Sequence, residues 1–392
     1  MNSNNRLKFW ALNSATGRRM RKPYLILLAM LILTCVERNI ENRIDEEESA
    51  AIFKYQIDSL VRDHINVNEP GLALLISYKG EKLVCKGYGL RDLVANVPIT
   101  AKTNMRLASV SKQFTALCIL TLVDRGLLSL DTSVYEIFPY LIFKNISVEN
   151  LLNHTSGLPD YYDHFNSNWN RKKIVENKHV LNWLKTNPKF LFEPGSDYRY
   201  CNTGYIVLAE IVQKISGMEF SEYARKNVFE VVNMKEANYY NLAKPRTIKE
   251  RAYCYQRDSI KKFVKMDGFF MNGIMGDGAV YCNIDDYYEY DKALRLKSKR
   301  LLNKMDFDVI FKPSVTYEYE GKPKHYALGW SVTDSTAAHT GGWLGVDTYT
   351  KRYLDFPLTI ALFSNRTDVL FDSGLWKKID SLAYVKARKE YH

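Results

Sequence analysis

The sequence has no apolar run long enough to cross a membrane and no closely spaced cysteine pair. Tyr24 to Val36 is uncharged over only 13 residues, whereas a membrane-spanning helix needs about 20 apolar residues. None of the six cysteines forms a C-x-x-C pair, which excludes a zinc ribbon, a thioredoxin-type site and a disulfide-framed miniature domain. Internal repeats and low-complexity segments are also missing, so the 392 residues have the composition of a globular protein.

Motifs of three common enzyme classes are absent. The chain has no G-x-S-x-G elbow, no G-x-G-x-x-G loop and no H-E-x-x-H helix, so α/β-hydrolase, dinucleotide-binding and zinc-protease interpretations lack support. His154, Asp160, Asp163 and His164 lie close together without a recognised zinc spacing, and we assign them loop and structural roles. We expect neither a metal nor another cofactor.

The positive charge of the chain is concentrated at one end. The formal net charge is +11, but six of the 55 basic residues lie within residues 1–34, which hold no acidic residue. The other 49 exceed the 44 acidic residues by only five, a surplus typical of a soluble surface. Because no basic stripe with interleaved aromatic residues occurs, we do not expect nucleic-acid binding.

The N-terminal segment is typical of an export signal. Basic residues from Arg18 to Lys22 precede an apolar run as long as the core of a signal peptide. The run ends in Ile32-Leu33-Thr34-Cys35, which resembles the box where bacterial lipoproteins are lipidated on the cysteine, here Cys35. We interpret residues 1–36 as a lipoprotein signal, a plain signal peptide or a short uncleaved anchor, beginning at Met1 or Met20. The protein would then be exported to the periplasm or cell envelope, and the anchor or lipid would attach it to a membrane.

Hydrophobic patterning predicts strands near both ends of the chain and helices mostly between them. The predicted helices cover residues 45–64, 107–125, 205–215 and 375–386. The predicted strands cover residues 72–78, 82–87, 328–332, 346–353 and 358–363. The 107–125 segment is apolar on most sides, so we expect a buried helix that ends at Gly126.

This order predicts an α/β (α+β) fold with one antiparallel sheet built from both chain ends. Residues 45–105 and 275–392 would supply the sheet and its flanking helices. Residues 106–274 would form a mostly helical part on one side. Since binding sites favour such junctions, we expect the active site where the two parts meet. We also expect the protein to act as a monomer.

A candidate nucleophile stands at the start of the buried helix. Ser109-Val110-Ser111-Lys112 spells S-x-x-K, and this spacing places Ser109 and Lys112 on one helix face. A serine hydroxyl needs a base to take its proton, and a partly desolvated lysine can serve. The start of a helix also offers backbone N–H groups to a developing oxyanion. In isolation, the same residues are more typical of a capping serine followed by an exposed lysine.

Two further motifs carry groups that acyl transfer uses. Tyr200-Cys201-Asn202 follows a turn and precedes the 205–215 helix. A tyrosine close to Lys112 can move protons, and an asparagine can orient a substrate amide. His339-Thr340-Gly341-Gly342 lies in a predicted strand, where glycines let a substrate approach the backbone. Taken singly, these motifs describe a loop tyrosine with a capping asparagine and a strand with a turn.

Together and in this order, the three motifs resemble those of the serine β-lactamase and penicillin-binding-protein superfamily, in particular its class C-like branch. Supporting phrases are Leu152 to Pro159 (LNHTSGLP), Pro194 to Asn202, and Gly276 to Tyr281 (GDGAVY). The similarity covers residues 48–385. It implies a β-lactamase-like fold and a serine hydrolase that works through an acyl-enzyme.

The resemblance also implies the catalytic roles. Ser109 would be acylated, and Lys112 and Tyr200 would share the proton transfers. Asn202 would bind the amide of the substrate. Glu149 opens an E-x-x-L-N match, which carries the deacylating residue in class A enzymes. Here it precedes the tyrosine motif instead of following it, and we interpret it as coincidence.

On the late strand, the resemblance assigns His339, Thr340 and Gly341 to substrate binding. The backbone N–H groups of Ser109 and Gly342 would form the oxyanion hole. His339 stands where many relatives have lysine, and a largely neutral histidine weakens the recognition of a carboxylate. Candidate substrates are D-Ala-D-Ala-like peptides, related amides, small esters and β-lactams. The alternative is an envelope protein that keeps the fold without turnover.

Overall fold

The computed structural model describes residues 47–391 of the chain. The expected export signal of residues 1–36, with lipidation at Cys35, lies outside these residues. Among the described residues, no helix is both long and apolar enough to cross a membrane, and the five cysteines are free thiols. Helical backbone covers residues 47–62, close to the prediction of 45–64. Residues 57–391 belong to one compact unit, which contains everything described below.

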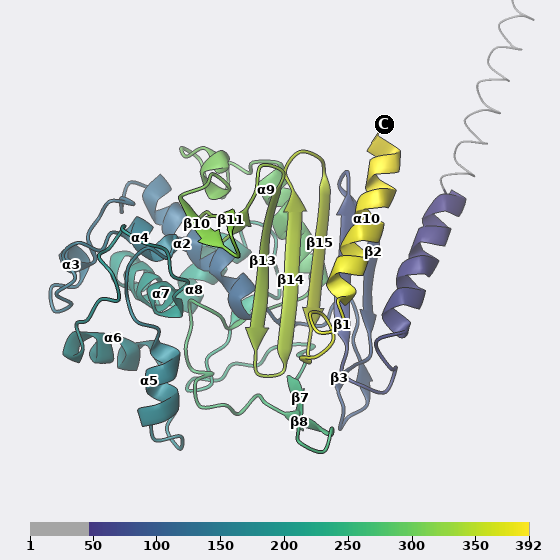
Figure 1. The fold of residues 1–392 in the computed structure, drawn as a ribbon, viewed down its shortest axis with the longest axis horizontal. Helices are drawn as coiled ribbons and strands as arrows, with labels where there is room; N and C mark the ends of the chain where they lie inside the picture. Colours follow the sequence, from purple (N-terminus) through teal and green to yellow (C-terminus); the bar gives the residue numbers. More distant parts are fainter. Residues whose placement is uncertain (1–46, 392) are drawn as a thin grey trace, which may run out of the picture. The chain divides into compact units, whose positions relative to one another are not determined.

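An eight-stranded antiparallel sheet forms the centre of this unit, in the order β10-β11-β12-β13-β14-β15-β1-β2 (Figure 1). Its strands are β1 (Leu72–Tyr78), β2 (Glu81–Tyr88), β10 (Val315–Tyr319), β11 (Lys322–Tyr326), β12 (Ser331–Val332), β13 (Thr336–Trp343), β14 (Val346–Tyr353) and β15 (Leu358–Ser364). β1 pairs with β15, so segments from the two ends of the unit meet within the sheet. The prediction of one antiparallel sheet built from both chain ends is confirmed.

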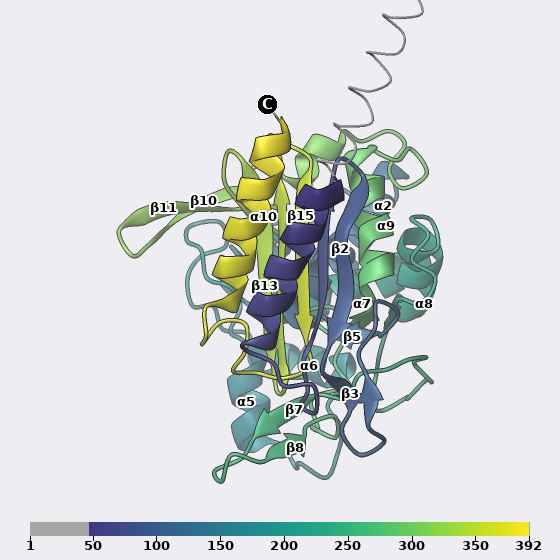
Figure 2. The same cartoon turned by 90° about the vertical axis from the view of Figure 1, so that its right-hand side faces the viewer.

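Two inner strands of the sheet, β1 and β15, are covered on both faces. Every residue of β1 and β15 is buried, which explains their uninterrupted apolar sequences. Helix α9 (Ile284–Arg295) contacts β1 and β15, and helix α10 (Leu375–Tyr391) contacts β15 from the opposite face (Figures 1 and 2). At the other edge, the β10–β11 hairpin projects away from the sheet (Figure 2).

One predicted strand is mostly wrong. Residues 328–332 were expected to be extended, but only Ser331–Val332 pair, as β12. Gly329 has a φ of 83°, and a Cβ placed on it would lie 3.0 Å from the carbonyl oxygen of Lys112. The chain therefore turns where it passes the start of helix α2, and the strand begins only after that turn.

The residues between the two halves of the sheet form helices joined by long loops. Their helices are α2 (Lys112–Asp124), α3 (Val134–Ile137), α4 (Val148–Leu152), α5 (Tyr161–Asn168), α6 (Asn177–Thr186), α7 (Asn202–Ser216) and α8 (Phe220–Ala224), with shorter turns η1 (Ala108–Ser111), η2 (Arg225–Phe229) and η3 (Phe307–Ile310). Short strands outside the main sheet are β3 (Leu90–Asp92), β4 (Val97–Pro98), β5 (Met105–Arg106), β6 (Asn238–Tyr239), β7 (Tyr255–Arg257), β8 (Phe263–Lys265) and β9 (Val280–Cys282).

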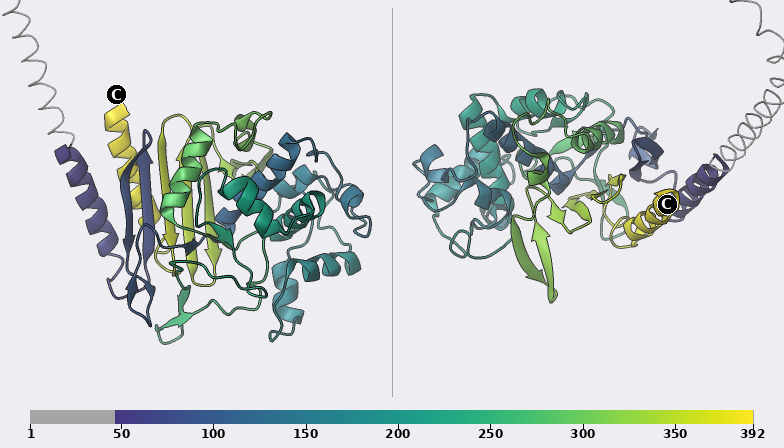
Figure 3. Two further views of the ribbon diagram at one scale, coloured as in Figure 1. Left: turned by 180° about the vertical axis from the view of Figure 1, so that it is seen from behind. Right: turned by 90° about the horizontal axis from the view of Figure 1, so that it is seen from above.

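Helix α2 is buried on nearly all sides, which its uniformly apolar sequence predicted. It contacts α7 and α8, and seen from behind it lies between the sheet and the other helices (Figure 3). One hydrophobic cluster runs from Leu75 in β1 through Phe114 in α2 to Ile206 in α7. The sheet and the helical part thus share a core, and the boundaries at residues 105 and 275 stay a prediction.

Candidate active site

Ser109 lies in the η1 turn, between the sheet and helix α2. The residue before it, Ala108, has a φ of 46°, a left-handed conformation that costs a non-glycine residue about 1–2 kcal/mol. This bend explains why the predicted helix begins as a 3₁₀ turn. The turn contacts β13 and β14, and the Thr348 hydroxyl donates to the carbonyl oxygen of Leu107 at 2.8 Å. Backbone strain held in place by its surroundings is typical of functional positions.

Lys112 is fully buried directly behind the serine. Its Nζ donates to Ser109 Oγ at 3.2 Å, to Asn202 Oδ1 at 2.8 Å and to the carbonyl oxygen of Asp277 at 2.9 Å. These three acceptors use all three donors of an ammonium group. The structure thus brings together Ser109, Lys112 and Asn202, which lie on separate elements.

Asn202 is the first residue of α7. The side chain of Asp160 fixes the position of its backbone. Asp160 Oδ2 accepts from the N–H of Asn202 at 2.8 Å, and Asp160 Oδ1 accepts from the N–H of Tyr162 at 3.0 Å. Asp160 therefore joins the starts of α5 and α7. This is the structural role that we expected for it.

Tyr200 packs against Lys112 through its ring. The ring centroid lies 4.9 Å from Lys112 Nζ and 4.2 Å from the ring of His154. His154 Nδ1 accepts from the N–H of Cys201 at 3.1 Å. Burial, reinforced by the charge of Lys112, holds the pKa of His154 well below its usual value. A neutral His154 thus packs against the ring of Tyr200. Tyr200 itself remains 37% exposed.

His339 on β13 is buried and neutral. Burial, with a further contribution from the charge of Lys112, lowers its pKa to about 3. Its Nδ1 donates to the carbonyl oxygen of Thr340 at 2.6 Å, so its Nε2 accepts from the hydroxyl of Tyr326 at 3.0 Å. His339 therefore brings no positive charge to the site.

The glycines of β13 differ in their surroundings. A Cβ on Gly341 would lie 2.6 Å from the carbonyl oxygen of Leu107 and 3.1 Å from the backbone nitrogen of Ser109, so only glycine fits against the η1 turn. A Cβ on Gly342 would meet nothing within 4 Å. Gly342 is exposed toward a pocket that Ser109 also lines. Thr340 is exposed as well, and its role in substrate binding stays a prediction.

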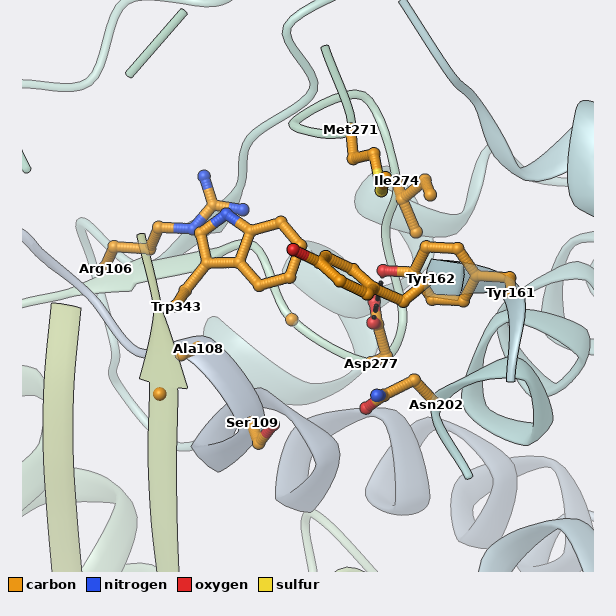
Figure 4. Close-up of a pocket in the computed structure, with 12 residues that line it drawn as sticks. Arg106, Ala108, Ser109, Tyr161, Tyr162, Asn202, Met271, Ile274, Asp277 and Trp343 are labelled. Atoms are coloured by element: carbon orange, nitrogen blue, oxygen red, sulfur yellow. Dashed lines mark hydrogen bonds between the residues drawn. The ribbon is translucent and has the colours of Figure 1, made fainter. Parts of the chain in front are cut away.

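That pocket is a cavity of about 220 Å³ in front of the serine (Figure 4). The predicted residues among its walls are Ser109, Asn202 and Gly342. The walls that the sequence did not predict include Arg106, Tyr161, Tyr162, Met271, Ile274 and Trp343. Arg106 and Trp343 adjoin two of the motifs in the sequence, which is the signal that could have found them. Tyr161 and Tyr162 lie at the start of α5, and Met271 and Ile274 lie on a loop; neither segment carries a motif.

Of two acidic residues near the site, Asp277 lines the pocket and Glu149 does not. The hydroxyl of Tyr161 donates to Oδ2 of Asp277 at 3.0 Å. Burial raises the pKa of Asp277 above its usual value. Glu149 lies on α4 and accepts from the hydroxyl of Ser314 at 2.9 Å, away from the pocket walls. Its position agrees with the interpretation of E-x-x-L-N as coincidence.

A second hollow lies on the Tyr200 side. It has a volume of about 610 Å³ and is formed by residues 195–200 and the β10 strand, with Thr155. The rings of Tyr198 and Tyr317, which both line it, stack with their centroids 3.8 Å apart. Tyr200 lines this groove and not the smaller pocket, whereas Ser109 lines the pocket and not the groove.

Sequence comparison identifies the family of the chain. Residues 57–383 match the family model described as Beta-lactamase. Penicillin-binding protein 4* of Bacillus subtilis (strain 168) is 30% identical over 327 residues, which cover 79% of this chain and 72% of the relative. A D-aminopeptidase of Brucella anthropi is 26% identical over 279 residues, which cover 67% of this chain and 50% of the relative.

Structural comparison agrees. A penicillin-binding protein from Bacillus halodurans superposes with a TM-score of 0.73 at 25% identity, over 83% of this chain and 98% of that chain. The D-amino acid amidase from Ochrobactrum anthropi SV3 shares the fold, with a TM-score of 0.72 at 20% identity, over 87% of this chain and 99% of the amidase. The predicted β-lactamase-like fold is confirmed. The comparisons support a serine hydrolase, and the chain belongs to the β-lactamase family, within the superfamily of serine β-lactamases and penicillin-binding proteins.

Proposed function

We propose that this protein hydrolyses D-residue peptides, related amides or small esters through an acyl-enzyme on Ser109. The observation that carries the proposal is the hydrogen bond of 3.2 Å from Lys112 Nζ to Ser109 Oγ. The same lysine is tied to Asn202 and to the backbone of Asp277. A nucleophile and its base are thus held at hydrogen-bond distance beside an open pocket, which is the arrangement that nucleophilic catalysis needs.

In the proposed reaction, Lys112 first loses one of the three protons that it donates in the structure, and its free amine then accepts the proton of Ser109 as the serine oxygen bonds to the substrate carbonyl carbon. The N–H groups of Ser109 and Gly342 donate to the oxyanion. When the tetrahedral intermediate collapses, the bond to the leaving group breaks, and Lys112 and Tyr200 return a proton to that group. Water then attacks the ester on Ser109 by the reverse proton path and releases the acid.

The relatives and the size of the pocket support the proposed substrate class. Two relatives are a D-aminopeptidase and a D-amino acid amidase by name, and a third is a penicillin-binding protein. The cavity of about 220 Å³ beside Ser109 suits a small acyl group. β-Lactams are further candidates, because their amide opens by the same attack.

A fluorophosphonate probe tests the serine. We expect one covalent adduct by intact mass in the wild type and none in Ser109→Ala. Ser111→Ala is the matched control, because Ser111 lies in the same turn but its hydroxyl accepts from the N–H of Val280 instead of facing Lys112. A wild-type protein that takes up no probe and cleaves no chromogenic amide, ester or β-lactam would contradict the proposal. That result would favour the envelope protein without turnover.

We further propose that residues 1–36 direct export, that Cys35 carries a lipid, and that the mature protein is a monomer. The uncharged run from Tyr24 to Val36, with Cys35 near its end, supports the first two points. The measurement is the intact mass of the protein from the membrane fraction, with Cys35→Ser as the control, and light scattering for the assembly. A soluble mature protein without added lipid mass would contradict lipidation.

A further inference from the structure

Arg106 is a buried cation in the pocket wall that the reaction above does not use. It ends β5, three residues before Ser109, and pairs with Tyr281 of β9. Its side chain is only 6% exposed, and it lines the cavity beside Ser109. Its Nε is buried without a hydrogen-bond partner. Among residues 47–391, we also find no carboxylate paired with its guanidinium.

A buried guanidinium without an ion pair needs an interaction partner for its charge. Arginine keeps its charge in proteins, and burying a charge without a counter-charge is strongly unfavourable. The indole of Trp343, 6.0 Å from the guanidinium carbon, supplies a weak cation–π contact (Figure 4). Trp343 is itself fixed, because its Nε1 donates to Asn272 Oδ1 at 2.8 Å. The indole therefore positions Arg106 without neutralising it.

The carboxylates near Arg106 form no ion pair with it among residues 47–391. Asp277 lines the same pocket and interacts electrostatically with Arg106, but it accepts its hydrogen bond from the Tyr161 hydroxyl. Asp267 forms an ion pair with Arg251 at 2.6 Å and accepts from the backbone N–H of Cys254 at 2.9 Å. Neither carboxylate pairs with Arg106. The open donors of the guanidinium thus remain available to a bound anion.

The position of the pocket indicates which half of a substrate it holds. In the proposed reaction, the leaving group receives its proton from the Lys112 and Tyr200 side, where Tyr200 lines the separate groove. The acyl group stays bonded to Ser109. The pocket is lined by Ser109, by Asn202 and by Gly342, so the part of the substrate that lies beside Arg106 is the acyl half.

We propose that Arg106 binds a carboxylate carried by the acyl half of the substrate. The enzyme would then prefer acyl groups that end in a carboxylate, such as the half-amides or half-esters of dicarboxylic acids and the acyl chains of acidic residues. The planar guanidinium can donate two parallel hydrogen bonds to such a group. The same charge repels a free ammonium in this pocket, so this proposal narrows the proposed substrates to acyl groups without one. This proposal rests on the proposed function of Ser109.

Two pairs of chromogenic esters test this preference. The p-nitrophenyl monoesters of glutaric and adipic acid carry an acyl carboxylate, whereas the butyrate and pentanoate esters are uncharged. For each protein the readout is the ratio of kcat/KM for the anionic ester to that for the uncharged one. This ratio does not depend on the fraction of folded enzyme.

We expect a ratio above one in the wild type and a fall of about 10- to 100-fold in Arg106→Gln, the range for a lost hydrogen-bonded charge pair. Arg106→Lys should keep part of the preference. Arg91→Gln is the control, because Arg91 is a half-buried arginine that likewise has an unpartnered Nε, pairs with Glu250 and lies outside the pocket. A ratio that is the same in Arg106→Gln and in the wild type would overturn the proposal.

A binding experiment separates this proposal from the proposed function. In a Ser109→Ala background, calorimetry with the glutarate and butyrate esters measures affinity without turnover. We expect tighter binding of the anionic ester, and loss of that difference when Arg106→Gln is added. If the wild type cleaves no ester but this difference is present, the hydrolase proposal fails and the carboxylate site stands. If esters are cleaved but the anionic ester binds no better, the carboxylate site fails alone.

Discussion

Gly341→Ala tests whether strand β13 sets the position of the nucleophile. The strand runs so close to the η1 turn that a methyl group on Gly341 would lie 2.6 Å from the carbonyl oxygen of Leu107 and 3.1 Å from the nitrogen of Ser109. A third contact, 2.2 Å to the hydroxyl of Thr348, involves a buried side chain whose hydroxyl donates to the carbonyl oxygen of Leu107. The two backbone contacts cannot be relieved by rotation, so the strand and the turn must separate.

The size of that separation sets the expected effect. Restoring 3.0 Å between the new methyl group and the Leu107 oxygen requires a shift of about 0.4 Å, and the shift moves Ser109 with the turn. Catalytic groups need to be held within about 0.5 Å, and a displacement of 1 Å can cost about 100-fold in rate. We therefore expect kcat/KM to fall by about 10- to 100-fold. Overpacking of this kind costs about 1–3 kcal/mol of unfolding free energy.

The assay is hydrolysis of p-nitrophenyl butyrate, with urea unfolding of the same preparations. Gly268→Ala is the matched control, because a Cβ at Gly268 meets nothing within 4 Å and its rate and stability should stay near those of the wild type. A Gly341→Ala enzyme with full kcat/KM would refute the reasoning, since the strand would then have no influence on Ser109. A stability loss with unchanged kcat/KM would refute it equally.

Two further predictions concern proton transfer and pH. Tyr200→Phe should keep the fold and lose about 100-fold in kcat, because the ring beside Lys112 stays while the hydroxyl is removed; an unchanged kcat in a steady-state assay would exclude the tyrosine from proton transfer. Asp347→Asn should raise the melting temperature at pH 8. Burial, with the charges of Asp372 and Asp368, raises the pKa of Asp347 to about 7, so its ionisation reduces wild-type stability as the pH rises from about 4 to about 7. Melting curves from pH 5 to pH 8 should show a difference that shrinks at low pH, and a difference of constant size would contradict the assignment.

Much of the fold could be predicted because local sequence and tertiary position agree. The apolar runs of β1 and β15 are uninterrupted because both faces of these strands are buried, and α2 is apolar on all sides because helices and sheet surround it. The turn of the first hairpin has positive φ at Lys79 and Gly80, as a two-residue turn between antiparallel strands requires. In these segments, the hydrophobic pattern and the turn residues indicate the same structure.

The prediction for residues 328–332 was wrong because a tertiary contact determines the chain there. An apolar pattern gives no sign that Gly329 must pass the backbone of Lys112. The pocket walls were missed for a related reason. Tyr161 and Met271 reach the cavity from α5 and from a loop far away in the sequence, and neither belongs to a pattern that repeats along the chain. Residues brought together only by folding leave no periodic signal.

The charges around Ser109 show where an anionic substrate can be recognised. His339 occupies the position of a lysine in many relatives, and its Nδ1–H is already bonded to the carbonyl oxygen of Thr340, so it offers neither charge nor a free ring donor. Lys112 uses its three donors on Ser109, Asn202 and the backbone. Arg106 alone among these three basic residues has a buried donor, its Nε, without a partner in the described chain, and it lines the pocket without an ion pair. If Arg106 binds a carboxylate as proposed, the histidine and the arginine together move the recognition of that group from strand β13 to the pocket beside Ser109.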